Sequence, residues 1–374
     1  MSHSPHTRLL ACLIPALLAG SAFGQATDPA PMQRSFFIGR TNFSDFTSAP
    51  AVAEEMVLTS TEMAVPVAWD ELVVSWNVPP GVYLKVEARA VFPDHATKYY
   101  NLGEWSEDPA RHPRQSGGPQ TDSDGTVKID TLVLARHGGK AQVRVTLGSI
   151  YKMQSPRLKF LGLSFCDSQF RAPPREPNRA AWGKVIPVPE RRQAEYGDEG
   201  WCSPTSLSMV LGYWGETLHR PELNRAVPEV AAAISDTNLP GTGNWPFNTA
   251  YAGAFPGLRA YVARLDDISE LEAWIAAGVP VVMSVSSHLT NDRHSGQDNG
   301  HLIVCCGFTE TGDIVANDPG VSVKSNERAR RVYPRQRVIE AWKKSKNAVY
   351  LIYPENAAIP ETIPRHWAEG GKLG

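Results

Sequence analysis

The sequence predicts two folded regions, an all-β sandwich of jelly-roll type followed by an α+β domain. Apolar and polar residues alternate with a period of two through residues 35–165, which is typical of strands with one buried face. A proline-rich stretch at residues 171–190 then interrupts the pattern, because proline lacks a backbone donor and restricts the residue before it. Beyond it, apolar residues recur first at helical spacing and then in strand-like runs, which favours an α+β domain.

Turn sequences separate the expected strands of the first region. The prolines and glycine at residues 79–81 divide one alternating run at 72–77 from a second at 82–88. Further strands are expected at residues 126–134, 142–147 and 158–165, with a loop at 137–139. No segment here has the spacing of a helix, so antiparallel strands packed as a sandwich are the natural arrangement. We place this domain at residues 35–166.

The second domain is expected at residues 188–354, after a linker at 167–187. Helices are expected at 204–214, 222–234 and 268–277, and strands at 279–286, 301–308, 312–317 and 348–353. The tail at residues 355–374 has no periodicity, so we expect it to be a loose or surface-lying end.

The first 24 residues have the pattern of a signal peptide. His6 and Arg8 precede an apolar run, and Ala22 and Gly24 supply the small residues of a cleavage site. The apolar run is too short to cross a bilayer. An ordinary buried helix is the alternative reading. We therefore predict a bacterial protein that is secreted or periplasmic once residues 1–24 are removed.

Composition excludes several classes of protein. The formal net charge of −2 gives no electrostatic basis for binding nucleic acid, and no later segment offers about 18 consecutive apolar residues. Three histidines, His288, His294 and His301, do not have the spacing of metal ligands, so we expect no metal site and no cofactor. Small peptides, sugars and proteins remain open as partners at this point.

Four cysteines remain after the leader, which suits catalysis better than a disulfide framework. If Cys202 stays a thiol, then Cys166, Cys305 and Cys306 cannot all pair with one another. Cys305 and Cys306 lie in the apolar run HLIVCCGF, where buried free thiols are the simpler interpretation.

Cys202 lies just before an expected helix in the segment GWCSPTSLSMVLGYWG. Pro204 suits a first helical position, Ser203 can cap, and Gly215 can end the helix. The unpaired N–H groups and the positive dipole end of a helix favour a thiolate, which is the reactive form of cysteine. A small buried cysteine beside a helix cap is the alternative. We predict that Cys202 is a nucleophile.

His301 and Asp318 are expected to meet across a hairpin. His301 opens one strand, Asp318 closes the next, and a loop at residues 309–312 joins them. In a symmetric hairpin His301 faces Gly320, which makes Asp318 its diagonal neighbour on the same face, about 7–8 Å away at Cα. A carboxylate there can orient an imidazole that acts as the base of a cysteine nucleophile. Taken singly, His301 also fits a strand edge and Asp318 fits a plain turn.

Together these segments and VANDPG resemble the papain-like double-glycine leader peptidase-like family, the bacterial group related to bacteriocin-processing peptidases. The resemblance covers about residues 188–354 and implies a papain-like fold and peptide-bond hydrolysis. Its order of Gln, Cys, His and Asp implies Gln193 as oxyanion-hole donor beside Cys202, His301 and Asp318. An amide N–H next to a helix start also suits that role chemically. A solvated glutamine in a linker is the alternative for Gln193.

The sequence departs from the family pattern in two respects. Cys202 follows Gln193 by nine positions, which is longer than the family pattern, so the inserted loop at 195–198 must be accommodated. The chain also lacks the membrane and nucleotide-binding segments of transporter-linked members, so bacteriocin export is not implied.

Two other functions remain open from the sequence. The same triad would serve a papain-like amidase or acyltransferase acting on cell-wall peptides. Alternatively, an inactive module could grip sugar or protein through Trp76, Tyr99, Tyr100 and Trp105 of the sandwich. Core packing is the favoured role for these aromatics, since aromatic side chains dominate sandwich interiors. We therefore predict an exported cysteine peptidase that acts on a peptide or protein.

Overall fold

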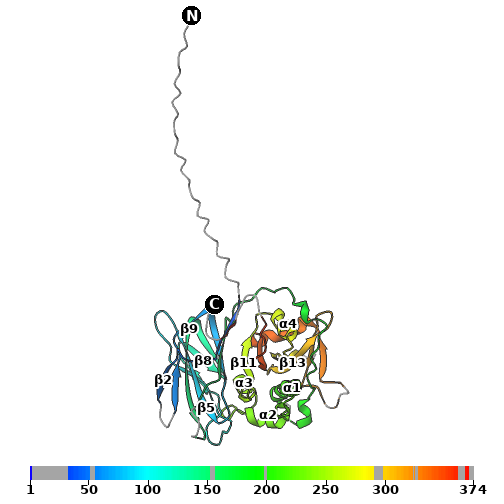
Figure 1. The fold of residues 1–374 in the computed structure, drawn as a ribbon, viewed down its shortest axis with the longest axis horizontal. Helices are drawn as coiled ribbons and strands as arrows, with labels where there is room; N and C mark the ends of the chain where they lie inside the picture. Colours follow the sequence, from blue (N-terminus) through cyan, green and yellow to red (C-terminus); the bar gives the residue numbers. More distant parts are fainter. Residues whose placement is uncertain are drawn as a thin grey trace. The chain divides into compact units, whose positions relative to one another are not determined.

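The computed structural model describes Met1 and residues 33–50, 55–151, 156–197, 200–289, 298–322, 324, 327–360 and 367–369. Residues 32–374 form one compact unit. The expected leader lies outside the described residues apart from Met1. In the described part the protein is mixed α and β, with more strand than helix, as predicted. Figure 1 shows the strands of the first half and the helices beside the second sheet.

The described elements of the N-terminal region, residues 35–166, are strands. They are β1 (Ser35–Arg40), β2 (Thr47–Pro50), β3 (Met56–Thr59), β4 (Met63–Asn77), β5 (Val82–Val91), β6 (Tyr100–Trp105), β7 (Gln120–Thr121), β8 (Gly125–Lys128), β9 (Thr131–Ser149) and β10 (Phe160–Cys166). Two ladders run through them, β1–β10–β4–β9 and β3–β9–β5–β6.

The long strand β9 belongs to both ladders. Its first residues pair with β4 and β8, and its later residues pair with β3 and β5. Strand β4 shows register shifts on either side of Trp69, where the chain bends. Strands that change sheets at such bends make the corners of a closed sandwich. The expected loop at residues 137–139 is therefore wrong, because these residues continue β9.

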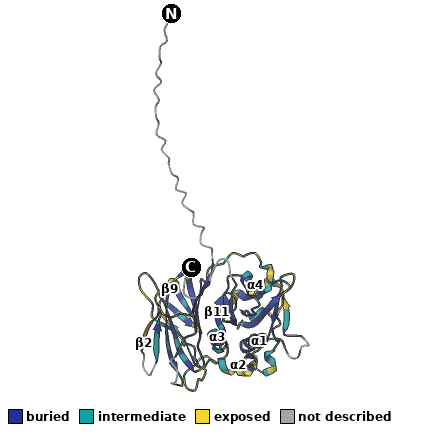
Figure 2. Ribbon diagram, viewed as in Figure 1, coloured by how far each residue is buried: buried dark blue, intermediate teal, exposed yellow. Residues whose placement is uncertain are grey.

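Aromatic side chains fill the interior of this region, as the strand alternation predicted. Trp76, Tyr100 and Trp105 are at most 2% exposed, which agrees with the expected role in core packing. Only Tyr99 of the four aromatics considered above is half-buried, and the guanidinium groups of Arg89 and Arg144 lie over its ring. Figure 2 shows the buried strands of both sheets in dark blue.

The C-terminal region combines helices with a second sheet. The helices are α1 (Cys202–Thr217), α2 (Val227–Ile234), α3 (Trp245–Ala254), α4 (Ile268–Ala276) and α5 (Arg335–Trp342). The strands are β11 (Leu258–Arg264), β12 (Val281–Val285), β13 (His301–Phe308), β14 (Ile314–Asn317), β15 (Arg330–Tyr333) and β16 (Ala348–Pro354). Short 3₁₀ turns are η2 (Arg179–Ala181), η3 (Gln193–Tyr196), η4 (Pro221–Leu223), η5 (Ser287–Leu289) and η6 (Lys343–Ser345).

The second sheet is antiparallel, in the order β11–β16–β12–β13–β14–β15. Helices α1 and α4 both pack against β12 and β13, and Figure 1 draws them on either side of β13. Strands 301–308 and 348–353 and the helix at 268–277 were predicted nearly to the residue. The sequence pattern did not reveal α3, β11 or α5, and only residues 227–234 of the expected helix at 222–234 are α-helical.

Helix α1 begins two residues earlier than expected and runs past Gly215 to Thr217. Its N-cap residue is Trp201, so the predicted capping by Ser203 is wrong. The Ser203 hydroxyl instead donates to Asn248 Oδ1 at 3.0 Å and lies 3.2 Å from the Tyr350 hydroxyl. The hydroxyl that was expected to cap the helix thus bonds to residues of other elements. Cys202 is consequently the first helical residue.

Side chains of the N-terminal region cover the edge of β11, the first strand of the second sheet. The Asn77 amide donates to Ala260 O at 2.7 Å and accepts from Ala260 N at 3.1 Å. The Ser75 hydroxyl accepts from Val262 N at 3.2 Å. An uncovered edge strand presents unpaired backbone groups, and here side chains satisfy them. The two regions are therefore joined by directional bonds as well as by apolar packing.

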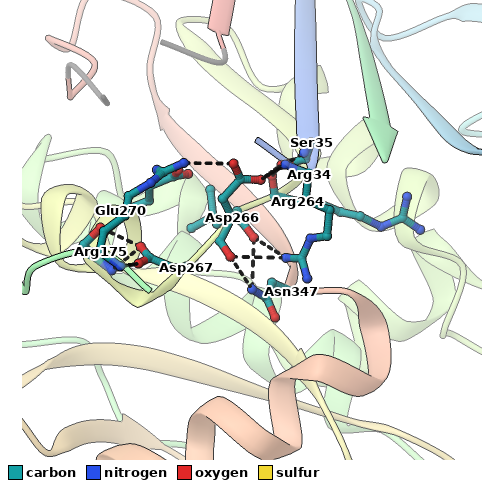
Figure 3. Close-up of polar contacts among 10 residues, drawn as sticks. Arg34, Ser35, Arg175, Arg264, Asp266, Asp267, Glu270 and Asn347 are labelled. Atoms are coloured by element: carbon teal, nitrogen blue, oxygen red, sulfur yellow. Dashed lines mark hydrogen bonds and ion pairs between the residues drawn. The ribbon is translucent and has the colours of Figure 1, made fainter. Parts of the chain in front are cut away.

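Figure 3 shows a second polar connection between the regions, centred on the buried carboxylate of Asp266. Asp266 Oδ1 accepts from the backbone N–H of Ser35 at 2.9 Å and from its hydroxyl at 2.7 Å. Its Oδ2 pairs with Arg175 Nη2 at 2.9 Å. Arg175 lies in the segment expected as a linker, which contains neither strand nor α-helix among its residues, 167–187. This segment is thus anchored on the C-terminal region.

Part of the tail, expected as a loose or surface-lying end, supplies a further strand. β17 (Trp367–Glu369) pairs in parallel with β1 over residues 37–39. After the last strand of the second sheet, the chain therefore adds a strand to the edge of the N-terminal sheet. Among the described residues, no helix combines the length and apolar character needed to cross a membrane.

Candidate active site

Cys202 lies half-buried at the first turn of α1, as the first helical residue. The side chain of His301 and the backbone N–H groups of Leu302 and Ser203 hydrogen-bond its sulfur. Burial raises the pKa of the thiol, but these donors and the charge on His301 outweigh burial and hold the pKa below its ordinary value. The predicted position at a helix start is confirmed, and the environment favours a thiolate.

His301 is the first residue of β13 and is 8% exposed. Its Nε2 lies 2.7 Å from Asp318 Oδ1, which leaves Nδ1 as the ring nitrogen that faces the Cys202 sulfur. Burial lowers the pKa of the imidazole, but the Asp318 carboxylate and the Cys202 sulfur raise it to about 10. At neutral pH the arrangement therefore favours an imidazolium beside a thiolate.

Asp318 follows β14 and is almost fully buried. Its Oδ1 accepts from His301 Nε2 and from Gly320 N at 2.8 Å, and its Oδ2 accepts from the Tyr333 hydroxyl at 2.5 Å. Burial raises the pKa of this carboxyl, but the charge of His301 and the three hydrogen bonds hold it below its ordinary value. These interactions thus keep the Asp318 carboxylate ionised although it is buried.

The hairpin register that was used to predict this contact holds at the site. Val304 pairs with Asn317, which extrapolates to His301 opposite Gly320. The ladder near the loop is offset by one residue, since Phe308 pairs with Ile314, and a bulge between Cys305 and Gly307 restores the expected register. A side chain at Gly320 would meet His301 Cε1 at 3.1 Å, so a residue without Cβ leaves room for the ring.

Gln193 begins η3 and is 9% exposed, so the solvated alternative is wrong. Its backbone N–H donates to Pro319 O at 2.9 Å, which ties it to the loop between Asp318 and Gly320. The extra residues before Cys202 are taken up by η3 and by Gly197, which has a left-handed φ of 77°. The structure therefore brings the backbone of Gln193 to the turn that carries Asp318.

Tyr333 is a residue of this site that the sequence reasoning did not identify. It lies on β15, opposite Ile314 of β14, and its ring reaches back along the sheet to Asp318. Ala316 shares that face of β14 by register, and its small side chain suits the passage of a ring. Nothing in the segment RRVY distinguishes this tyrosine from an ordinary strand residue, so only the structure could reveal it.

One group of side chains elsewhere could hold a metal ion by its geometry. Ligand atoms of Asp70, His137 and Asp167 lie within 4.8 Å of one another in the N-terminal region. Asp70 already accepts from the backbone and hydroxyl of Ser168, at 2.7 and 2.6 Å. Asp167 Oδ1 accepts from two backbone N–H groups of the following turn. These bonds account for Asp167 as a turn-forming residue and for Asp70 as an acceptor that holds Ser168 of the same turn.

Two family models match the chain. Residues 185–350 match the Peptidase_C39 like family, and residues 32–165 match the Peptidase C39 N-terminal domain. The crystal structure of a protein from Bacillus anthracis described as a C39-like peptidase is similar at 21% identity, over 45% of this chain and 96% of that chain, with a TM-score of 0.33. No curated protein matches the chain.

The first match agrees within a few residues with the segment on which the sequence resemblance was based, residues 188–354. The second match extends the relationship to the N-terminal region, for which the sequence had suggested no family. Residues 185–350 are therefore a Peptidase_C39-like domain, and residues 32–165 match the N-terminal domain that accompanies C39 peptidases.

Proposed function

We propose that this protein is an exported cysteine peptidase that hydrolyses peptide bonds with Cys202, His301 and Asp318. One observation carries the proposal: a single imidazole hydrogen-bonds the sulfur at the start of α1 and, through its other nitrogen, a buried carboxylate 2.7 Å away. This is the geometry of a nucleophile, its base and the group that orients the base. Family membership supports the same class of chemistry.

The reaction follows from the charges at the site. The Cys202 thiolate attacks the peptide carbonyl carbon, and the imidazolium of His301 then donates its proton to the leaving amine. His301 then takes a proton from a water molecule, whose oxygen attacks the carbonyl carbon of the thioester. The C–S bond breaks, the acyl group leaves as a carboxylic acid, and the Cys202 thiolate is regenerated beside the imidazolium. Asp318 accepts from Nε2 throughout, so the proton exchanged with substrate is held on Nδ1.

Gln193 is proposed as an oxyanion donor together with the backbone N–H of Cys202. Two observations support this role, the burial of Gln193 and the bond from its backbone to Pro319 beside Asp318. Preorganised donors of this kind stabilise the charge that develops on the carbonyl oxygen in the transition state.

Export is proposed from the leader pattern at residues 1–24, with the mature protein in the periplasm or outside the cell. We also propose that residues 35–166 form a jelly-roll-type sandwich. Its two ladders, β1–β10–β4–β9 and β3–β9–β5–β6, have the strand order of the two sheets of that fold. The C-terminal region, with its nucleophile at a helix start and its base on a strand, is proposed to be papain-like.

A direct test incubates the purified mature protein with a mixture of peptides of known sequence and identifies new termini by mass spectrometry. Cleavage by the wild type that disappears in Cys202→Ala is expected. The matched control is Cys166→Ala, which alters a buried thiol of the N-terminal region whose pKa burial raises to about 11. Cleavage that persists in Cys202→Ala would contradict the proposal, as would equal losses in both variants.

A further inference from the structure

Tyr333 holds the side of the Asp318 carboxylate that His301 does not use. Its hydroxyl donates to Oδ2 at 2.5 Å, whereas His301 Nε2 and Gly320 N share Oδ1. Tyr333 is 6% exposed and Asp318 is 1% exposed, so water has little access to replace this bond. The carboxylate is thus fixed by donors on both oxygens.

The tyrosine remains a donor at any pH at which the protein would work. Burial raises the pKa of the Tyr333 phenol, and the negative charge of Asp318 raises it further, while the nearby Arg331 acts in the opposite direction. A phenol that donates to a carboxyl stabilises its ionised form more than its protonated form, because the hydrogen bond to the charged oxygen is stronger. Two titratable side chains face Asp318, namely His301 from β13 and Tyr333 from β15. The Cys202 sulfur lies on the other side of His301.

We propose that Tyr333 is a positioning residue of the active site, which acts on His301 by keeping Asp318 ionised and correctly oriented. The chemical role rests on the proposed function, but the coupling of Tyr333 to His301 does not. Without a donor on Oδ2, the buried carboxylate is less stable as an anion, and only the two donors on Oδ1 still fix its rotation about the Cβ–Cγ bond. Its interaction with the imidazolium then weakens, and the imidazolium becomes a less stable counter-ion for the thiolate beside it.

Tyr333→Phe tests this inference, because it removes the hydroxyl and keeps the ring. The primary readout is the pKa of His301, followed by NMR titration of protein labelled with ¹⁵N-histidine, with the signal assigned by its absence in His301→Gln. We expect the pKa of His301 to fall in Tyr333→Phe, since a less stabilised anion supports the imidazolium less well. A second readout is peptide turnover, in which kcat is expected to fall about tenfold with little change in KM.

Tyr213→Phe is the matched control. The Tyr213 hydroxyl donates to the backbone oxygen of Gly278 at 3.0 Å, away from the carboxylate. This variant also loses one tyrosine hydrogen bond, and it is expected to leave both the pKa of His301 and kcat unchanged. Thermal unfolding of both variants shows whether Tyr333→Phe keeps the fold, and the NMR titration is interpreted at temperatures below its melting transition.

The outcomes separate the two proposals. A pKa of His301 that is the same in Tyr333→Phe and wild type would overturn the positioning role, and so would an equal shift in Tyr213→Phe. An increase in KM with an unchanged kcat would overturn it as well, because this result would assign Tyr333 to substrate binding. If the pKa falls but the wild type cleaves no peptide, the positioning role stands and the proposed function fails.

Discussion

Cys202 is half-buried, whereas the adjacent residues Cys305 and Cys306 are fully buried. The larger difference between these thiols lies in the charges around them. Cys202 faces His301 and two backbone N–H groups, and its pKa is lowered. Cys305 and Cys306 lie farther along the strand that His301 begins, and both are fully buried. Burial raises the pKa of both thiols, that of Cys306 to about 12.

The difference shows that burial alone does not decide whether a thiol is reactive. Desolvation raises the pKa of all three thiols, and the Arg330 guanidinium near Cys306 only partly offsets this rise. At Cys202 the imidazolium of His301, together with the backbone donors, outweighs it. That cation exists because Asp318 keeps the imidazole charged. The reactivity proposed for Cys202 therefore depends on two residues of a hairpin a hundred positions later in the chain.

Replacing His301 with alanine is expected to have the largest effect, because it removes the cation that separates Cys202 from the other thiols. Turnover should fall on the order of 10⁴-fold or more, since members of a triad act as a unit. The double variant with Cys202→Ser should be little slower than either single variant. Steady-state peptide hydrolysis measures both effects. Full turnover by His301→Ala would end the cysteine-hydrolase proposal.

Gln193→Ala sharpens the comparison by separating transition-state stabilisation from thiol activation. If Gln193 supplies an oxyanion donor, kcat should fall about 10²–10³-fold. Alkylation of Cys202 by iodoacetamide should keep its wild-type rate, because His301 and the helix start are unchanged. Kinetics and labelling of the same preparation check the two statements. A slower alkylation would instead indicate that Gln193 supports the thiolate.

The thiols themselves should differ in alkylation on the order of 100-fold or more at about pH 6.5. Cys202 has a lowered pKa, so a larger fraction of it is ionised at this pH than of an ordinary thiol. Cys166, Cys305 and Cys306 have raised pKa values and stay protonated there. Peptide mapping after short exposure to iodoacetamide identifies the modified residue. Equal labelling at Cys166 would contradict the proposed environment.

Turnover also requires the protonated imidazole to supply the leaving amine with a proton. Because the pKa of His301 is raised to about 10, activity should persist above neutral pH and decline as the pH passes about 10. A pH profile of kcat measures this limb. A decline near the ordinary histidine value would indicate that Asp318 does not hold the charge.

Asp318→Asn is expected to cost less than Gln193→Ala, about 10- to 100-fold in kcat. An asparagine oxygen can still accept from Nε2 and orient the ring, although it no longer supplies a charge. The pKa of His301 should fall in the same variant, which NMR titration can follow. A loss as large as that of His301→Ala would show that charge, more than orientation, is what the carboxylate supplies.

The smallest effect on activity is expected for Cys306→Ala, which removes one of the buried thiols with which Cys202 was compared. The side chain is fully buried, so its loss should lower the free energy of unfolding by about 1–3 kcal/mol. Turnover measured well below the melting temperature should be unchanged. Chemical denaturation measures the first effect and peptide hydrolysis the second. Reduced turnover in a fully folded variant would mean that Cys306 affects the site through the adjoining bulge.

The sequence alone determined the local parts of this site. The apolar stripe of α1, the run of β13 and the turn after β14 are encoded within short segments, and a symmetric hairpin predicted that Asp318 would reach His301. Two irregularities, the loop offset and the bulge, cancel each other at the site end of the strands. The family resemblance added Gln193, whose burial no local pattern indicated.

Only the tertiary structure decided the contacts between distant segments. Tyr333 reaches Asp318 across a sheet, and Asn77 meets Ala260 from a position 183 residues earlier in the chain. The same cause explains the misplaced cap of α1, since Ser203 bonds to Asn248 and Tyr350 instead of to its own helix. Hydrogen-bonding groups accept partners from anywhere in the fold, whereas periodicity records only which face of an element is buried.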